Sequence, residues 1–577
     1  MAMKKIFKLA IAFGVALMSA SCMNLEPKDQ MADGYVWSSA SNFALFANQF
    51  YGWTRDFQGS TSLTSMNGVL DGPHSDFRSD LLVGTGENVY NKGTNVILTS
   101  DPNYSELYKR LYYVNLLLKK AESFSDPDAL KTPVGEAYFF RAYLYFELVQ
   151  MFGDVILVTE PVDLDNERLY GSRNDRKEVI AQCVEDLKKS MELLGETPQE
   201  DGRLCRYSAA AFLSRVALYE GTWQKYHNNN STLSQELLSE AVAAAKAVMD
   251  SNNYELFYSD ALGGRDSYRY MFILEKVKCN PADLTRADNK EYILAKRHDE
   301  ALKPIGTNIT HGIGTATYPT RKLANMYRCQ DGLPIEKSPL FQGYSGLTSE
   351  FNNRDNRMNA TLLKHGQKRW DNDGKWRTAW DATDEEDGKC IVTSVFSNTG
   401  YACWKWATER QVQDAYESYD YPVIRYAEVL LKYAEATYAL NGEISDAQLD
   451  ESLNLVRRRS NPTMAKLSNT LVSANGLDML EEIRAERTVE LFHEGFRIDD
   501  LKRWKTAETE MPGNRVGILW KGTQFETSWA NQSNPLDGQG CVIKYDGCTW
   551  AKKNYLLPLP SNETQLNPQL GQNDGWK

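Results

Sequence analysis

Apolar residues recur every three or four positions through the first half of the chain, which is the spacing of one face of a helix. The first run covers residues 104–121. The second follows Thr132-Pro133 and reaches Phe152, where Gly153 is expected to end the helix. Further runs cover residues 179–194, 210–223 and 237–248. Each run predicts a helix with one apolar stripe.

The pattern changes between about residue 255 and residue 420, where Gly, Asn, Asp, Thr and Trp become frequent and no helical period persists. Periodicity returns after Pro422, in residues 424–438, 449–456 and 480–492. Successive helical hairpins are typical of tetratricopeptide-like arrays, although the repeat consensus itself is not visible. We therefore predict a mainly α fold with a large, irregular, loop-rich region. We expect one compact unit with four divisions along the chain. They are a signal peptide (1–21), an N-terminal helical region (22–260), the loop-rich region (261–420) and a C-terminal helical region (421–577).

The N-terminus has the order of a bacterial lipoprotein signal. Lys4, Lys5 and Lys8 precede an apolar stretch from Leu9 to Met18, and Ser19-Ala20-Ser21 supplies small residues immediately before Cys22. Cys22 is therefore the predicted lipidation site, and acyl chains there would hold a soluble body on a membrane. Ser19 stands where a lipobox usually has Leu. An ordinary secreted protein stays open as the alternative.

Composition excludes one class of partner. The 577 residues carry a formal net charge of −12, and no run of basic residues interleaved with aromatics occurs, so nucleic acid is not expected as a ligand. Nine cysteines are present, and Cys22 leaves eight in an exported protein. Cys541 with Cys548, and Cys390 with Cys403, are candidate disulfides. No C-x-x-C motif supports a zinc ribbon.

Motifs for catalysis and metal binding are incomplete. His493-Glu494 would begin a zincin motif, but Arg497 stands where the second histidine should be. Residues 371–374 (DNDG) resemble part of a calcium loop, yet the flanking ligand positions hold Arg369 and Trp380. We predict no cofactor, and a structural calcium ion is left open.

A glycosidase needs a pair of carboxylates, but among 77 acidic residues some suitable pair always occurs. Such pairs are therefore weak evidence for catalysis. Glu486 and Glu490, together with Arg484 and Arg487, lie on one predicted helix. We expect them to form a structural ion network.

Several segments, in this order along the chain, resemble the SusD/RagB family of Bacteroidetes outer-membrane lipoproteins. Each motif alone is weak, but their order is highly specific. The matching segments are Cys22–Leu25, Arg141–Pro161, Asn353–Met358, Thr399–Tyr401, Tyr421–Ala436, Glu486–Trp504 and Tyr555–Asn573. We expect Glu486–Trp504 to form one helix. Departures from the family pattern occur at Ser460-Asn461 and at Asn356.

The resemblance implies four tetratricopeptide-like helix pairs and a partner, a SusC-like TonB-dependent outer-membrane transporter. It further implies that the helical repeats pack against this transporter and leave the loops for ligand. We expect a non-catalytic, surface-exposed lipoprotein, anchored in the outer membrane, that passes oligosaccharides to the transporter. A peptide-binding RagB-like protein, a helical glycoside hydrolase and a purely interacting scaffold remain alternatives.

A carbohydrate site needs aromatic rings for the C–H faces of sugars and Asp, Asn or Arg for their hydroxyls. The chain has 31 Tyr and 13 Trp. Three stretches supply ligand-binding candidates: Asp71, Asp76, Arg78, Tyr90, Asn91 and Tyr104; then His311 and Tyr318; then Trp370, Trp376 and Tyr401. In the family, the place of Tyr104, four residues before Tyr108, often faces ligand.

Each candidate also has a structural interpretation. Tyr104 fits the apolar stripe of its helix equally well, and Asp76 and Arg78 are more typical of solvated charges. Trp404 and Trp406 alternate as on a strand with one buried face, and we expect core positions for both. Trp370, Trp376 and Trp380 lie among polar residues, where exposed rings would be functional.

Overall fold

The computed structural model describes residues 36–57, 72–162, 166–306, 309–310, 316–370, 376–378, 398–408, 410, 412–413 and 415–576. For residues 368–370 and 376–378 the description is of the backbone. Cys22, Asp71, His311, Trp380, Cys390 and the DNDG segment lie outside the described residues.

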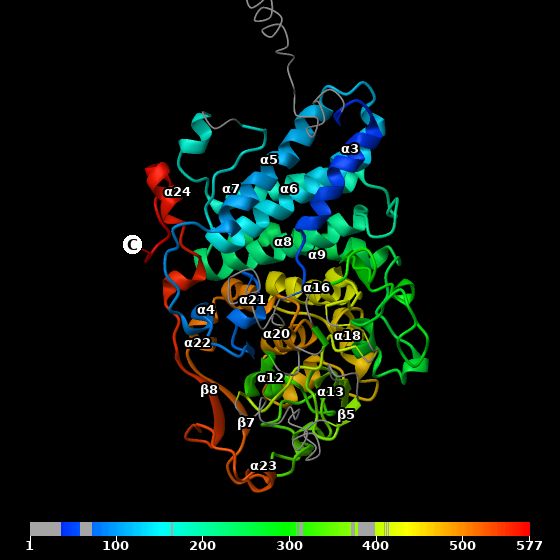
Figure 1. The fold of residues 1–577 in the computed structure, drawn as a ribbon, viewed down its shortest axis with the longest axis vertical. Helices are drawn as coiled ribbons and strands as arrows, with labels where there is room; N and C mark the ends of the chain where they lie inside the picture. The colour runs from blue at the N-terminus through cyan, green and yellow to red at the C-terminus, as the bar shows by residue number, and fades with distance from the viewer. Residues whose placement is uncertain are drawn as a thin grey trace, which may run out of the picture.

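An array of long helices forms the first half of the fold. The helices are α5 (Pro102–Ala121), α6 (Lys131–Phe152), α7 (Arg176–Leu193), α8 (Arg206–Trp223) and α9 (Ser231–Asp250). Each packs against the next, α16 (Tyr426–Asn441) continues the array on α9, and α20 (Met479–Glu490) follows on α16. In Figure 1, α5 to α9 fill the upper half of the view, and α16 and α20 lie below them. The predicted mainly α fold of successive hairpins is confirmed.

Local sequence sets where these helices begin and end. The Asp101 side chain accepts a hydrogen bond from the amide of Asn103 and caps α5, with Pro102 in its first turn. At the end of α6, Gly153 has φ 74° and ψ −113°, a conformation that suits glycine alone, so the predicted stop is confirmed. The prediction of a single apolar stripe is wrong for α6. This helix is buried on all sides, because α5, α7 and α3 (Ala40–Ala47) pack around it.

The region between α9 and α16 consists of short elements and loops. Strand β2 (Tyr292–Lys296) pairs antiparallel with β6 (Tyr421–Arg425), so the two ends of this region lie side by side. The other pairs are β1 (Leu82–Val83) with β3 (Tyr318–Pro319), β4 (Lys368–Trp370) with β5 (Trp376–Thr378), and β7 (Gly513–Leu519) with β8 (Cys541–Cys548). These pairs were not predicted. In Figure 1, β7 and β8 descend at the lower left, away from the long helices.

Short helices complete the described chain. They are α4 (Val89–Lys92), α10 (Ser267–Met271), α12 (Arg321–Met326), α13 (Asn356–Thr361), α17 (Asp446–Asp450), α18 (Leu453–Ser460), α19 (Asn469–Ala474), α21 (Arg497–Arg503), α22 (Ala507–Glu510), α23 (Gln524–Ser528) and α24 (Ser561–Leu566). Single turns of 3-10 helix include η1 (Asn48–Trp53), η2 (Asp76–Arg78), η4 (Glu167–Tyr170), η8 (Ser349–Phe351) and η9 (Lys552–Tyr555). In none of the described helices does an apolar stretch reach the length and hydropathy needed to cross a bilayer.

The segment Glu486–Trp504, expected as one helix, is broken into α20 and α21. His493 and Gly495 both have positive φ, 62° and 78°, which ends the helical path. The break directs the Glu494 carboxylate toward Lys405 at 2.6 Å and Arg425 at 2.7 Å. The expectation of a continuous helix is therefore wrong.

Of the two disulfide candidates, only Cys541 with Cys548 lies wholly within the described residues, and this prediction is also wrong. Cys403, Cys541 and Cys548 are free thiols. Cys541 and Cys548 stand at opposite ends of the extended strand β8, roughly 20 Å apart at the usual rise of a strand. A disulfide requires Cα atoms within about 7 Å.

Candidate functional site

A buried ion network connects the loop-rich region to the helices. Five cationic side chains (Arg357, Lys405, Arg425, Arg457, Arg459) contact five carboxylates (Glu291, Asp355, Glu486, Glu490, Glu494). None of the ten residues is more than 5% exposed. The charges balance, as burial of so many ions requires. The network thereby fixes α13, α18 and β6 to α20.

The predicted network on α20 is confirmed for its glutamates, with partners elsewhere. Glu486 and Glu490 contact arginines of α13, α18 and β6, and not the arginines of their own helix. Arg487 pairs with Asp500 at 2.8 Å, on α21. Arg484 pairs with Glu481 alone among the described acids.

Backbone hydrogen bonds join the three stretches that carry the predicted ligand residues. We name their meeting place the loop junction, which comprises residues 76–83, 316–320, 361–363 and 399–406. The amide of Thr320 donates to Leu81 O at 2.9 Å, and the amide of Cys403 donates to Thr317 O at 3.1 Å. The amide of Leu363 donates to Ala402 O at 2.9 Å. Segments about 240 residues apart in sequence therefore lie side by side.

The first predicted stretch forms a compact cluster. The guanidinium carbon of Arg78 lies 3.4 Å from the ring centroid of Tyr90, a close cation–π contact. Asn91 donates to the carbonyls of Phe77 and Ser79 and accepts from Arg515 Nε at 2.8 Å. The amide of Gly495 donates to Asp76 Oδ2 at 3.0 Å. The cluster binds η2 and α4 to the segment that follows α20.

Most of these candidates have structural roles. Asp76 and Asn91 are fully buried and Arg78 is 5% exposed, so the solvated-charge interpretation of Asp76 and Arg78 is wrong. A ligand that approaches from solvent would meet Tyr90, which is half-buried, before these groups. Tyr90 stays a candidate ring.

Tyr104 lies in the core, as its structural interpretation proposed. Its ring packs on Tyr108 and Phe152 at 5.0 and 5.2 Å between centroids, and burial raises the pKa of its hydroxyl to about 12. Tyr318 is likewise fully buried, in β3. As contacts for a ligand from solvent, both residues are corrected to packing positions.

In the third stretch, Tyr401, Trp404 and Trp406 are buried as well. The hydroxyl of Tyr401 donates to Glu350 Oε2 at 2.9 Å, and Tyr401 is 2% exposed. Trp404 and Trp406 are buried, so their predicted core positions are confirmed, but neither belongs to a strand and Trp406 has φ 76°. In the β4–β5 pair, Trp370 is the register partner of Trp376. Ligand contact by these two residues stays a prediction.

Asp80 anchors the loop junction, and this role was not predicted from the sequence. Its carboxylate accepts from Arg497 Nη2 at 2.8 Å and from Lys322 Nζ at 2.6 Å. Burial opposes a charge on Asp80, but these two cations outweigh it and hold the pKa of the carboxyl well below its usual range. A pairing across 417 residues leaves no periodic signal in the chain.

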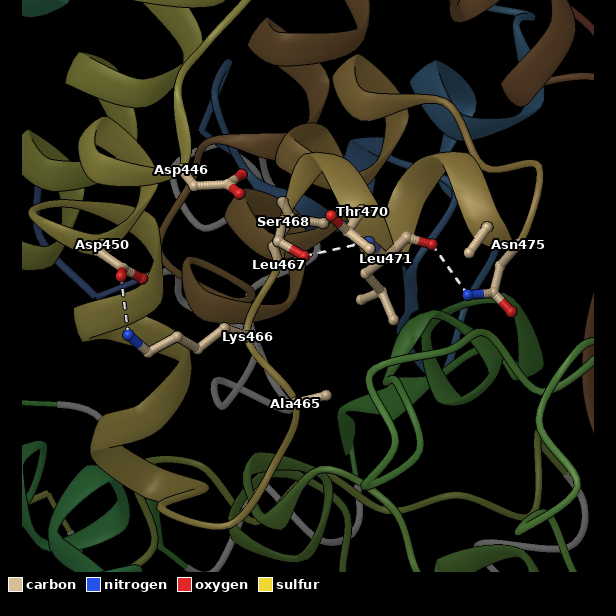
Figure 2. A pocket seen from close by; sticks show the side chains of 10 residues that line it. Asp446, Asp450, Ala465, Lys466, Leu467, Ser468, Thr470, Leu471 and Asn475 are labelled. Carbon is tan, nitrogen blue, oxygen red and sulfur yellow. Dashed lines mark hydrogen bonds and ion pairs between the residues drawn. The ribbon is translucent and has the colours of Figure 1, made fainter.

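One hollow among the described residues lies apart from the loop junction (Figure 2). It has a volume of about 570 Å³ and lies between α17 and α19. Asp450 pairs there with Lys466 at 2.8 Å, and Asn475 donates to Leu471 O at 2.9 Å. Its polar groups thus bind one another, and no aromatic ring lines it.

Comparison with known families identifies the class of protein. The family model described as "SusD family" matches residues 282–576, more than half of the chain. A second model, described as "Starch-binding associating with outer membrane", matches residues 77–218. The chain belongs to the SusD family.

Individual relatives are distant in sequence. SusD-like protein P38 of Formosa agariphila is 22% identical over 89% of this chain and 94% of its own length. SusD-like protein P25 of the same organism is 29% identical, but the match spans 24% of its length and 21% of this chain. A crystal structure of a SusD-like carbohydrate binding protein from Bacteroides fragilis superposes with a TM-score of 0.70 at 24% identity, covering 92% of this chain and 99% of that one. These likenesses establish the shared fold.

Proposed function

We propose that this protein is a non-catalytic, cell-surface glycan-binding lipoprotein that captures oligosaccharides and passes them to a SusC-like TonB-dependent transporter. The observation that carries the proposal is the loop junction. It joins, through the hydrogen bonds of Thr320, Cys403 and Leu363, the three stretches in which rings and hydrogen-bonding groups for sugars are concentrated. Such loops on a rigid scaffold are where ligand sites commonly form.

The family supports the carbohydrate class of ligand. One matching model is described as starch-binding, and the Bacteroides fragilis neighbour is described as carbohydrate binding. Tyr90 supports the chemistry, because Arg78 holds one side of its ring and a stacking platform that is already ordered loses little entropy on binding. The proposed division keeps 22–260 and 421–577 as helical regions and 261–420 as a loop-rich insert.

Glycan-array binding of the chain from Met23 onward, followed by calorimetry, tests the proposal. We expect Tyr90→Ala and Trp376→Ala to weaken binding of the selected oligosaccharide by about tenfold each, the loss of one aromatic contact. Tyr112→Ala is the matched control, because Tyr112 is an exposed tyrosine on α5 and should leave binding unchanged. Release of reducing ends would instead indicate a glycosidase. Binding of peptides alone, or of no ligand, would contradict the proposal.

The anchor and the partner require a separate experiment. We expect Cys22→Ser to move the protein from the outer-membrane fraction to the soluble fraction, because the acyl chains would be lost. Cross-linking of the wild-type protein in cells should capture a TonB-dependent barrel. Capture of no barrel would remove the transporter from the proposal.

A further inference from the structure

A second, smaller pocket lies between α12, α20 and α21, directly behind Asp80. We name it the Arg484 pocket, after the residue on which its chemistry depends. Its volume is about 210 Å³, which equals roughly seven water molecules at the density of liquid water. Arg484, Trp504, Thr506, Lys322, Arg328 and Arg497 contribute to its wall, and Glu481 and Glu510 also line it. None of the ligand candidates from the sequence lines this pocket.

Most charges in the wall are already paired. Arg328 makes a bidentate contact with Glu482 at 2.8 and 2.9 Å. Arg497 makes a bidentate contact with Asp80, which also holds Lys322. Lys322 also pairs with Glu510 of the wall, so these three cations are neutralised by carboxylates in or behind the wall. They are fixed in place and have little capacity left for a ligand.

Arg484 differs from the other cations. Its side chain is 9% exposed, and its ion partner is Glu481 at 2.8 Å, whose side chain is 63% exposed. A pair of this kind at spacing i, i+3 is weak in water, and a better acceptor can replace it. Arg484 Nε is buried and has no hydrogen-bond partner in the structure. A guanidinium has five N–H donors, and leaving a buried one unsatisfied costs free energy.

Two neighbours complete the chemistry of the pocket. The Arg484 guanidinium carbon lies 4.9 Å from the ring centroid of Trp504, which is 4% exposed and forms an apolar wall. Thr506 Oγ1 is also buried without a hydrogen-bond partner. A charged fork, a hydroxyl and an indole ring thus meet in a space for one small ring.

We infer that the Arg484 pocket binds one carboxylate-bearing sugar residue, such as a hexuronate. The carboxylate would replace Glu481 on the guanidinium, the ring oxygen or a hydroxyl would bond to Thr506, and the C–H face would cover Trp504. Preference for a sugar acid over other small carboxylates rests on the proposed glycan-binding function. The pocket itself is separate from the loop junction and its rings.

Calorimetry of the folded chain from Met23 onward with D-glucuronate, D-glucose and acetate tests the inference. We expect glucuronate to bind about tenfold more tightly than either of the others, because only glucuronate offers both a carboxylate and a sugar face. Arg484→Gln should weaken glucuronate by about tenfold or more, and Thr506→Val should weaken it by a smaller factor. Arg458→Gln is the control, since Arg458 is exposed and bonds to the carbonyl of Pro462.

The inference would be overturned if glucose or acetate bound as tightly as glucuronate. It would also be overturned if both pocket variants bound glucuronate as tightly as the wild type. Thermal melting checks that the variants are folded, and Thr506→Val supplies the answer if Arg484→Gln does not fold. A neutral oligosaccharide selected on the array should bind Arg484→Gln unchanged. If the wild-type protein bound no neutral oligosaccharide while Arg484 still controlled glucuronate, the loop-junction function would fail and the present inference would stand.

Discussion

Asp80 shows how one side chain can hold together distant parts of the chain. Its carboxylate is 1% exposed and contacts Arg497 of α21 and Lys322 of α12. The loop junction begins beside it, because the carbonyl of Asp80 accepts from the Thr320 hydroxyl at 3.0 Å. Loss of this single charge would therefore leave the buried guanidinium of Arg497 without its main acceptor, while Lys322, whose side chain is 37% exposed, would keep Glu510.

We expect Asp80→Asn to lower the free energy of unfolding by about 3–5 kcal/mol, the usual effect of breaking a buried ion pair from one side. Urea denaturation at pH 7 measures it. Asp128→Asn is the control, because the Asp128 side chain is 85% exposed and its pair with Lys131 is screened by water and should contribute little to stability. A change in Asp80→Asn no larger than that of the control would show that Asp80 does not anchor the junction.

Glu428 makes stability depend on pH. Burial alone would raise the pKa of its carboxyl, but Arg215 and Lys432 lower it from 4.5 to about 2. The folded state therefore holds fewer protons than the unfolded state, and this stability is present above pH 4.5 and is lost as pH falls toward 2. The advantage of the wild type over Glu428→Gln should narrow by about 2 kcal/mol between pH 6 and pH 3. Urea denaturation at both pH values checks this, and an unchanged difference would refute it.

At the scale of elements, the hairpin β7–β8 meets the loop junction at a very close approach. A Cβ atom on Gly517 would lie 1.7 Å from Thr399 O, so the two backbones touch where only glycine fits. The neighbouring amide of Ile518 donates to the same oxygen at 2.7 Å. The position of the Thr399–Trp406 segment therefore depends on the absence of a side chain at Gly517.

We expect Gly517→Ala to destabilise the protein by about 1–3 kcal/mol and to weaken glycan binding, because the junction must move to admit the methyl group. Gly538→Ala is the matched control, since nothing lies within 4 Å of its Cβ position. Thermal denaturation and calorimetry with the array-selected oligosaccharide provide the two measurements. Equal melting temperatures for both variants would contradict the close approach.

Elements with a local cause could be predicted from the sequence, and elements with a distant cause could not. The periodic stripes of α5 and α9 and the stop at Gly153 depend on residues within one turn. The β2–β6 pair depends on two segments more than 100 residues apart, and the break at His493 depends on Lys405 and Arg425. Neither dependence leaves a pattern within a window of the chain.

The structure brings together the stretches that the sequence singled out, while the partners of their individual residues could not be predicted. The polar groups of Arg78, Asn91 and Tyr401 contact Tyr90, Arg515 and Glu350. Residue type and local polarity are the same for a ligand contact and for a buried hydrogen bond. Only the partner, which comes from elsewhere in the chain, distinguishes them.

At the scale of the whole molecule, the described fold requires no disulfide. Seven cysteines in the described residues are free, and most of them are buried. We expect mass spectrometry after alkylation in denaturant to find Cys541 and Cys548 as thiols. Reduction should leave the melting temperature unchanged. A linked Cys541–Cys548 peptide would contradict the extended course of β8, and Cys541→Ser with Cys548→Ser would then be destabilising rather than neutral.

The antiparallel pairing of β2 with β6 has a consequence for how such proteins diversify. The two strands bring residues 297 and 420 to the same edge, so the intervening chain leaves and re-enters the frame at one place. The entropic cost of closing such a loop segment grows only with the logarithm of its length, so doubling the length costs about 0.6 kcal/mol. Evolution can therefore lengthen or shorten the loops of this segment at little expense to the helices beneath, provided that Asp355, Arg357 and Lys405 keep their places in the buried ion network.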